Sequence, residues 1–315
     1  MRLVYNFTKE KMSDFSYTIR NYQPADFNRF VKLRIEAGKL EPTGRPLSPQ
    51  TITESLGRPN YSPERDLFLV EIAGALVGYM DIQSELTIGR VILTGWIRPE
   101  HRRKGLAAKL LGYATHRANE LGAKVTHVNI LEDNKIAKSV LSKLGFKYVR
   151  REFEMRLDMS RVRQKNLNQA ASKCRCLLPG EEDRLVYIQN LSFTGSWGFN
   201  PNTIEELTYW TGLSHRSPED VVLACDDDEV IGYCWTEVYE NQEEGQILMI
   251  GTDPAYRGRG IGKRVLLAGL AYLKNRGVKV TSLNVDSENK VAYALYQSVG
   301  FEVRTSWLWY EKMVD

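Results

Sequence analysis

A glycine-rich basic segment at residues 257–263 is the first feature of this chain that could do chemistry. It reads Arg257-Gly-Arg-Gly-Ile-Gly-Lys263 and lies between a strand pattern and a helix pattern. Glycine lets the backbone approach a ligand closely, and the N–H groups and positive dipole of a helix that begins here would converge on an anion. Arg257 and Arg259 could add charge-assisted contacts to a pyrophosphate. Such a turn can also be only a tight connection, so the segment needs independent support.

The chain repeats itself, and the repeat includes this segment. Residues 99–146 match residues 254–301 without a gap, with Pro99, Arg102 and Gly105 falling on Pro254, Arg257 and Gly260. The first copy of the segment therefore consists of Arg102, Arg103, Lys104, Gly105, Leu106 and Ala107. The same offset carries Arg20 and Pro24 onto Arg175 and Pro179. The repeated unit, which runs from the region of Arg20 to that of Phe146, is too long for a solenoid repeat and is a domain.

Strand and helix patterns surround the glycine-rich segment in the second copy. We expect, in chain order, strands at residues 220–225, 229–238 and 245–252, a helix at 262–276 that ends at Gly277, a strand at 278–285, a helix at 289–298 and a strand at 301–310. The first three strands are rich in β-branched and aromatic residues and suit an antiparallel meander. The sequence thus predicts an α/β fold of two tandem domains, each with a central, mostly antiparallel mixed sheet flanked by helices.

The domain boundaries follow from the repeat. We expect an N-terminal domain at residues 17–158 and a C-terminal domain at residues 173–315. Residues 159–172 between them are polar and basic, with neither a clean helical stripe nor strand alternation, and we interpret them as a linker.

The composition bears on partners and location. The chain has 43 Lys+Arg against 39 Asp+Glu, a net charge of only +4, so no basic field indicates a nucleic-acid binder. No apolar run approaches the roughly 20 residues that span a bilayer, and the N-terminus lacks the apolar run of a signal peptide, so we expect a cytoplasmic protein without membrane contact. The cysteines, Cys174, Cys176, Cys225 and Cys234, lack C-x-x-C spacing and favour reduced thiols over a metal site.

Two ordered motifs resemble the signature of the Gcn5-related N-acetyltransferases. The first, Arg257-Gly-Arg-Gly-Ile-Gly262 after Thr252-Asp-Pro254, is similar to the family's Gln/Arg-x-x-Gly-x-Gly/Ala after a strand. The second is similar to the family's Asn-x-x-Ala-x-x-x-Tyr-x-x-x-Gly-Phe and is formed by Asn289, Ala292, Tyr296, Gly300 and Phe301. The resemblance covers both halves of the chain, and the tandem arrangement looks like the mycothiol-synthase-like branch.

The resemblance implies an acyltransferase that uses acetyl-CoA. It implies that the backbone of Ile250, Gly251 and Thr252 pairs with the pantetheine arm of coenzyme A and that Asn289 touches the cofactor. The pyrophosphate would be held by Arg257, Gly258, Arg259, Gly260, Ile261, Gly262 and Lys263, and residues 102–107 are the first copy's equivalent.

Acetyl transfer to an amine needs a proton for the departing thiolate. Tyr296 occupies the family's tyrosine position, and a tyrosine stays protonated at pH 7, although Tyr296 could instead simply pack on a helix face. In the first copy Leu141 stands at this position and cannot transfer a proton. We therefore expect the chemistry in the second copy, with the first copy mainly structural.

The general base and the acceptor site stay open at the level of sequence. The resemblance implies a carboxylate where this chain has Gln246, which leaves Glu244, ranked slightly ahead, and Glu237 as candidates, although residues 240–244 also suit a solvated turn. Trp197 and Phe199 lie in an aromatic loop that could form a substrate wall or pack in the core.

The expected function is transfer of an acetyl group to the amine of a small molecule. Three alternatives remain: a peptide or protein amine as acceptor, activity in both domains, or a non-catalytic acyl-CoA sensor. The oligomeric state is open, and a monomer is compatible with two domains that form an internal pseudo-dimer.

Overall fold

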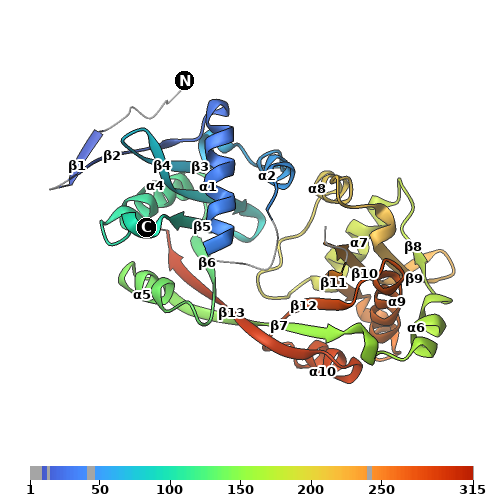
Figure 1. Ribbon diagram of the computed structural model, residues 1–315. Helices are drawn as coiled ribbons and strands as arrows, with labels where there is room; N and C mark the ends of the chain where they lie inside the picture. Colours follow the sequence, from blue (N-terminus) through green and yellow to red (C-terminus); the bar gives the residue numbers. More distant parts are fainter. Residues whose placement is uncertain (1–8, 13–14, 41–46, 240–242, 315) are drawn as a thin grey trace. The chain divides into compact units, whose positions relative to one another are not determined.

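The computed structural model describes residues 9–12, 15–40, 47–239 and 243–314 (Figure 1). The chain divides into two compact units: a first unit of residues 1–149 and 309–315, and a second unit of residues 150–308. This division differs from the one expected from the repeat, because the last residues of the chain belong to the first unit.

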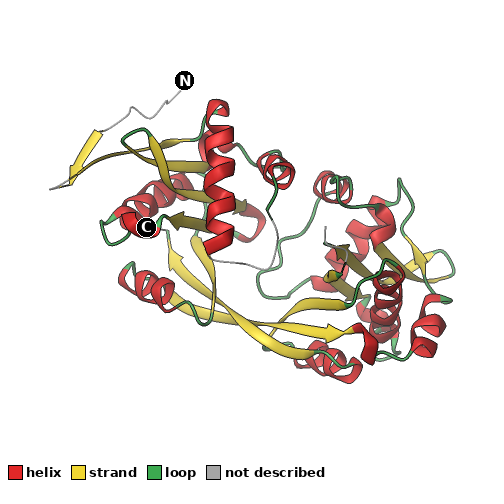
Figure 2. Ribbon diagram, in the orientation of Figure 1, coloured by secondary structure: helices red, strands yellow, loops and turns green. Residues whose placement is uncertain are grey.

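The first unit is a mixed sheet with helices packed on it (Figure 2). Its elements are β1 (Lys9–Met12), β2 (Phe15–Asn21), η1 (Pro24–Asp26), α1 (Phe27–Leu40), α2 (Pro49–Leu56), α3 (Pro63–Asp66), β3 (Leu67–Ile72), β4 (Ala75–Glu85), η2 (Leu86–Ile88), β5 (Arg90–Ile97), η3 (Pro99–His101), α4 (Leu106–Glu120), β6 (Val125–Leu131) and α5 (Lys135–Lys143). The strand order is β1-β2-β3-β4-β5-β6, followed by the end of β13 (Glu302–Met313). Strands β1 to β5 pair antiparallel, and β5 pairs with β6 in parallel.

The second unit repeats this arrangement. Its elements are β7 (Lys147–Asp158), which begins in the first unit, η4 (Met159–Arg161), α6 (Gln164–Ala171), β8 (Arg175–Cys176), α7 (Glu182–Phe193), α8 (Ile204–Thr211), η5 (Pro218–Asp220), β9 (Val221–Asp226), β10 (Glu229–Val238), β11 (Glu244–Thr252), η6 (Pro254–Tyr256), α9 (Ile261–Asn275), β12 (Val280–Asp286), α10 (Lys290–Val299) and the start of β13. The order from β7 is β7-β12-β11-β10-β9-β8. Only the β11–β12 pair is parallel among these. The predicted α/β fold is confirmed.

Residues 159–172, which the sequence led us to interpret as a linker without regular structure, form a 3-10 turn and helix α6. Leu167 is fully buried and Ala170 is buried, and α6 packs against α9. Helix α6 has few apolar residues, so the sequence shows only a weak helical periodicity there. Packing against α9 stabilises the helical conformation of this segment.

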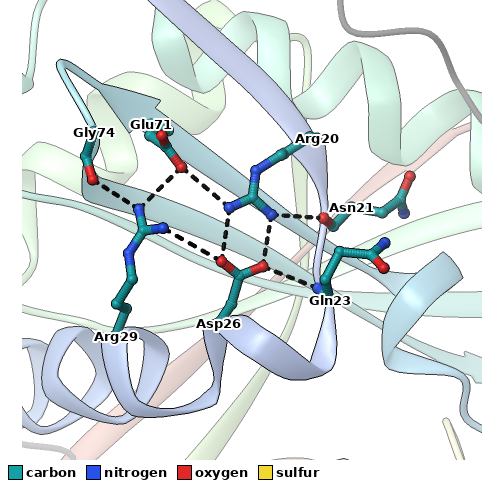
Figure 3. A network of polar contacts seen from close by, with 7 residues as sticks. All are labelled: Arg20, Asn21, Gln23, Asp26, Arg29, Glu71 and Gly74. Atoms are coloured by element: carbon teal, nitrogen blue, oxygen red, sulfur yellow. Dashed lines mark hydrogen bonds and ion pairs between the residues drawn. The ribbon is translucent and has the colours of Figure 1, made fainter.

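Each unit has its own ion pair, and the two pairs occupy equivalent positions of the repeat. In the first unit, the Arg20 guanidinium donates to both carboxylate oxygens of Asp26, at 2.6 and 2.7 Å, and Asp26 also accepts from the Gln23 backbone N–H (Figure 3). Arg29 and Glu71 extend this network. In the second unit, Arg175 donates to both oxygens of Glu181, at 2.6 and 2.9 Å, and the Leu178 backbone N–H donates to the same carboxylate. In the first unit the pair joins β2 to the turn that precedes α1, and in the second unit it joins β8 to the start of α7.

The core of the second unit lies on both faces of its sheet. On one face, α9 packs over β9, β10 and β11, and Cys234 belongs to that cluster with Val265 and Leu266. On the other face, α7 packs on β10 and β11, and Tyr233 belongs to a cluster with Leu185 and Ile188. Successive strand residues point to opposite faces, so Tyr233 and Cys234 serve different cores.

Helices that could cross a membrane are absent from the part of the chain that the structure describes, since each is too short or too polar.

Candidate active site

The glycine-rich segment of the second unit forms the turn that leads from β11 into α9. Gly260 is the N-cap residue of α9, and both Gly258 (φ +78°) and Gly260 (φ +79°) adopt the left-handed conformation. A Cβ on either residue would meet no atom within 4 Å, so backbone conformation, not crowding, calls for glycine here. In the described structure, no side-chain cap accepts a hydrogen bond from the first N–H groups of α9, which leaves them available to an anion.

The basic side chains of this segment have different environments. Arg257 donates from Nη2 to the backbone carbonyl of Ser192 at 2.7 Å, which ties the segment to the last turn of α7. The guanidinium of Arg259 lies 5.0 Å from the ring centre of Tyr256. Arg259 and Lys263 are exposed beside the N-terminus of α9, where they can contact phosphate.

The equivalent segment of the first unit has nearly the same backbone. Gly105 caps α4 with φ +72°, and Arg103 adopts φ +59° where the second unit has Gly258. A left-handed arginine costs about 1 kcal/mol relative to glycine. Arg102 donates from Nε to the backbone carbonyl of Ile97 at 2.8 Å. The first unit thus keeps the shape of the turn, with Lys104, Leu106 and Ala107 around it.

In β11, the strand that precedes the glycine turn of the second unit, one edge has no neighbouring strand after Ile247 within the described residues. Its parallel pairing with β12 runs from Glu244 to Ile247 and ends there, while its antiparallel pairing with β10 continues to Thr252. Residues 250–252 therefore keep backbone groups that can pair with an extended ligand. The same ending occurs in the first unit, where the β5–β6 pairing stops at Ile92.

Tyr296 and Asn289 lie on α10. Tyr296 is 5% exposed and packs with Phe301 and Cys234 in the α9 core, and burial, with a smaller contribution from Cys234, raises the pKa of its hydroxyl. Asn289 is the N-cap of α10, and its Oδ1 accepts from the Ala292 N–H at 3.1 Å. Asn134 caps α5 of the first unit in the same way, and Leu141 is buried there at the position of Tyr296. Asn289 therefore has a structural role whether or not it contacts a cofactor.

The two carboxylates proposed as bases differ sharply. Glu244 forms an ion pair with Arg156 and keeps 41% of its side chain exposed. Glu237 is 5% exposed and its Oε1 accepts from Arg216 Nη2 at 2.8 Å and Nε at 3.0 Å, with His215 Nε2 at 3.2 Å. This geometry favours Glu237, the second-ranked candidate from the sequence. Of the predicted acidic turn at residues 240–244, residues 240–242 lie outside the described residues.

The sequence comparison decides the family. The model of the acetyltransferase (GNAT) family matches residues 38–146 and 183–301, one segment in each copy. The chain belongs to the GNAT family. It is accordingly an acyltransferase, with tandem GNAT domains, and the family uses acyl-CoA as its acyl donor.

Relatives of known name agree with this membership. The chain is 27% identical to a mycothiol acetyltransferase of Amycolatopsis mediterranei over 79% of this chain and 88% of the relative. A GCN5-related N-acetyltransferase from Sphaerobacter thermophilus matches with a TM-score of 0.72 at 20% identity, covering 95% of this chain and 96% of that one. A tandem GNAT protein from the clavulanic acid biosynthesis pathway matches with a TM-score of 0.73 at 14% identity, covering 95% and 99%. The structural likenesses show the fold.

The residues of the second unit fit the acyl donor of a GNAT protein. An uncovered strand edge suits the amide groups of pantetheine, and a helix N-terminus behind two left-handed glycines suits pyrophosphate. Two buried hydroxyls close to that edge, those of Ser192 and Tyr233, have no hydrogen-bond partner in the described structure, which is how groups awaiting a polar ligand are arranged.

Sequence reasoning missed His215, Arg216, Ser192 and Tyr233. His215 and Arg216 follow α8 in a loop without a motif, and only the fold places them on Glu237. Ser192 and Tyr233 read as ordinary helix and strand residues. The scarcity of histidine, with four in the chain, was the one available signal for His215.

The aromatic loop that contains Trp197 and Phe199 lies between α7 and α8. Trp197 lies 5.5 Å from the Arg150 guanidinium, and Phe199 stacks on Phe193 with ring centres 5.3 Å apart. Phe199 thus helps to fix the end of α7. Both rings are half-buried, and their contact with an acceptor stays a prediction.

Proposed function

We propose that this protein is an acetyl-CoA-dependent N-acetyltransferase that transfers an acetyl group directly to the amine of a small molecule in its second unit. The observation that carries the proposal is that a glycine turn, an open β11 edge and Tyr296 occur together in the second unit. The first unit has Leu141 in the place of Tyr296. The similarity to a protein named mycothiol acetyltransferase supports a small-molecule acceptor.

The second unit would hold the donor with residues from three elements. The backbone of Ile250, Gly251 and Thr252 would pair with pantetheine. Residues 258–263 would bind the pyrophosphate through backbone N–H groups, with Arg259 and Lys263 adding charge. When bound, acetyl-CoA supplies an activated acetyl thioester.

Tyr296 would supply the proton that the departing thiolate takes. Burial raises the pKa of its hydroxyl, so the side chain is protonated throughout the neutral range. The described residues offer this hydroxyl no hydrogen-bond partner, which leaves its proton uncommitted within the protein.

Glu237 and His215 would together accept the proton that the acceptor amine loses. Buried Glu237 orients the imidazole through a 3.2 Å contact, and a histidine so held is the commonest acid–base group at neutral pH. Arg216 on the same carboxylate oxygen keeps the glutamate in place.

Thiol release tests the proposal. Purified protein with acetyl-CoA is offered a panel of small amines, including amino sugars, amino acids and polyamines, and a set of peptides with free amines. The expected result is thiol release with at least one small amine, lost in Tyr296→Phe. Release with peptides alone would assign a protein acceptor, and acetyl-CoA binding without release on any amine would favour a sensor. Residual transfer after Gly260→Arg would show that the first unit is also active.

A further inference from the structure

Three buried polar side chains gather at the end of α7 without hydrogen-bond partners. The hydroxyl of Tyr233, the hydroxyl of Ser192 and the Oε1 of Gln189 are each inaccessible to solvent and unpartnered within the described structure. Their residues are 0%, 7% and 3% exposed. Native proteins rarely bury polar atoms in this way, because each costs about 1–3 kcal/mol unless a ligand or water completes it.

Tyr233 and Ser192 both lie against Gly251. Tyr233 is the direct cross-strand neighbour of Gly251 on β10. A Cβ at Gly251 would lie 2.6 Å from Tyr233 Cε1 and 2.7 Å from Ser192 Oγ, so only glycine leaves room for both. The Tyr233 ring therefore extends from β10 over β11, towards the edge of β11 that β12 leaves unpaired after Ile247.

The Tyr233 hydroxyl keeps its proton. Burial is the main cause that raises the pKa of this hydroxyl, and Cys234 and Tyr296 add smaller electrostatic contributions. Tyr233 thus remains a hydrogen-bond donor on the α7 side of β11, while Tyr296 belongs to the α9 side.

The first unit lacks this arrangement. Its equivalent strand pair places Tyr79 opposite Trp96, so an indole ring stands where the second unit has Gly251. Trp96 is 7% exposed and packs in the core with Tyr79. Ala37 and Arg34 stand on α1 at the positions of Ser192 and Gln189 on α7. The two unpartnered hydroxyls beside a glycine therefore occur, among these equivalent positions, in the unit that has Tyr296.

We propose that the hydroxyls of Tyr233 and Ser192 donate hydrogen bonds to the carbonyl oxygen of the bound acyl thioester. A carbonyl oxygen has two lone pairs and can accept from both. It is also the atom on which negative charge develops during acyl transfer, where fixed donors in a water-poor site are most effective. The inference rests on the proposed function, since it concerns the donor that this function uses.

Binding measurements with two ligands test it. Acetyl-CoA has the carbonyl and free coenzyme A does not, so calorimetric affinities for both are compared in the wild type, Tyr233→Phe and Ser192→Ala. The expected result is a loss of about tenfold in affinity for acetyl-CoA in each variant, with less than a twofold change for coenzyme A. Equal changes for the two ligands, or no change for either, would overturn the assignment.

Stability without ligand provides the second readout. Removing an unpartnered hydroxyl breaks no bond, so Tyr233→Phe should have an unchanged or higher Tm in the absence of ligand. Tyr272→Phe is the matched control, because the Tyr272 hydroxyl donates to Asp220 at 2.9 Å and accepts from Arg276. The Tm of this variant should fall, while the preference for acetyl-CoA over coenzyme A stays the same. A Tm lowered in Tyr233→Phe would show a structural hydroxyl and contradict the inference.

The two proposals can fail separately. If the wild type binds acetyl-CoA and acetylates an amine but Tyr233→Phe behaves like the wild type, this inference falls and the proposed function stands. If the wild type binds neither acetyl-CoA nor coenzyme A, the proposed function falls and takes this inference with it.

Discussion

Glu237 lies directly opposite Gln246 across strands β10 and β11. Directly opposite residues of an antiparallel pair share a face, so the buried carboxylate stands one strand away from the position where the family resemblance implied a glutamate. Gln246 itself accepts from the Tyr239 hydroxyl at 2.9 Å. The structure therefore offers a carboxylate at this face even though residue 246 is an amide.

Glu237→Gln should destabilise the protein. Its partner Arg216 has a side chain only 10% exposed, and removing one member of a buried pair leaves the other charge uncompensated, at a cost of about 3 kcal/mol. Urea denaturation measures the loss. The double variant Glu237→Gln, Arg216→Met should recover part of it, whereas equal stability of the wild type and the single variant would mean that the pair contributes nothing.

His215→Asn should lower kcat about 100-fold with little change in the affinity for acetyl-CoA, because it removes the proposed proton acceptor but not the donor site. Steady-state kinetics with the acceptor found by thiol release measure the effect. His116→Asn is the control, since that side chain is 60% exposed on α4. An unaffected kcat in His215→Asn would assign the proton to another group.

Tyr296→Phe should lower kcat about 100-fold and leave the binding of acetyl-CoA near normal. Phenylalanine keeps the packing with Phe301, so the fold should survive, as circular dichroism can verify. Leu141→Met at the equivalent buried position of the first unit is the control and should keep full activity. Wild-type turnover in Tyr296→Phe would remove this tyrosine from the mechanism.

The pH profile gives a further check on Tyr296. A raised folded-state pKa means that the hydroxyl loses its proton only above the ordinary value near 10, so the acid form is fully present below it. The kcat profile should therefore show no decline attributable to this group between pH 7 and about pH 10. A wild-type decline in that range that Tyr296→Phe abolishes would contradict the direction of the shift.

Gly260→Ala and Gly262→Ala should differ. Alanine at Gly260 must adopt φ +79°, which costs about 1 kcal/mol and disturbs the start of α9, so acetyl-CoA affinity should fall about fivefold. At Gly262 a Cβ would lie 3.5 Å from Leu295 Cδ2 and Thr252 Oγ1, which is ordinary contact, and affinity should change less than threefold. Calorimetry measures both, and equal losses would refute the conformational argument.

Asp26→Asn should destabilise the first unit in a pH-dependent way. Burial alone would raise the pKa of Asp26, but hydrogen bonds from Arg20 and the Gln23 backbone outweigh it and lower that pKa. A lowered folded-state pKa means that the stabilisation is full above the unfolded value of about 3.9 and is lost as pH falls through the folded value. Urea denaturation should therefore show a difference between wild type and variant at pH 7 that shrinks towards pH 3. A difference independent of pH would exclude this ionisation.

Local patterns in the sequence were sufficient to predict much of this protein. The repeat, the glycine turn and the helix end at Gly277, where φ is +86°, depend on residues close together in the chain. Backbone conformation and capping are short-range effects, so residue type and spacing determine them. The contrast between Tyr296 and Leu141 was visible in the same way.

Tertiary structure decided what depends on residues far apart in sequence. The last residues of β13 belong to the first unit, where Thr126 donates to the Lys312 carbonyl, although the repeat assigned them to the second. Arg216 reaches Glu237, and Tyr233 covers Gly251, through strand pairing and helix packing that leave no local mark. The sequence by itself determined the family fold and the glycine turn, whereas the contact between Glu237 and His215 and the buried hydroxyls exist only once packing has brought separate segments together. Burial and cross-strand contact are properties of the folded chain.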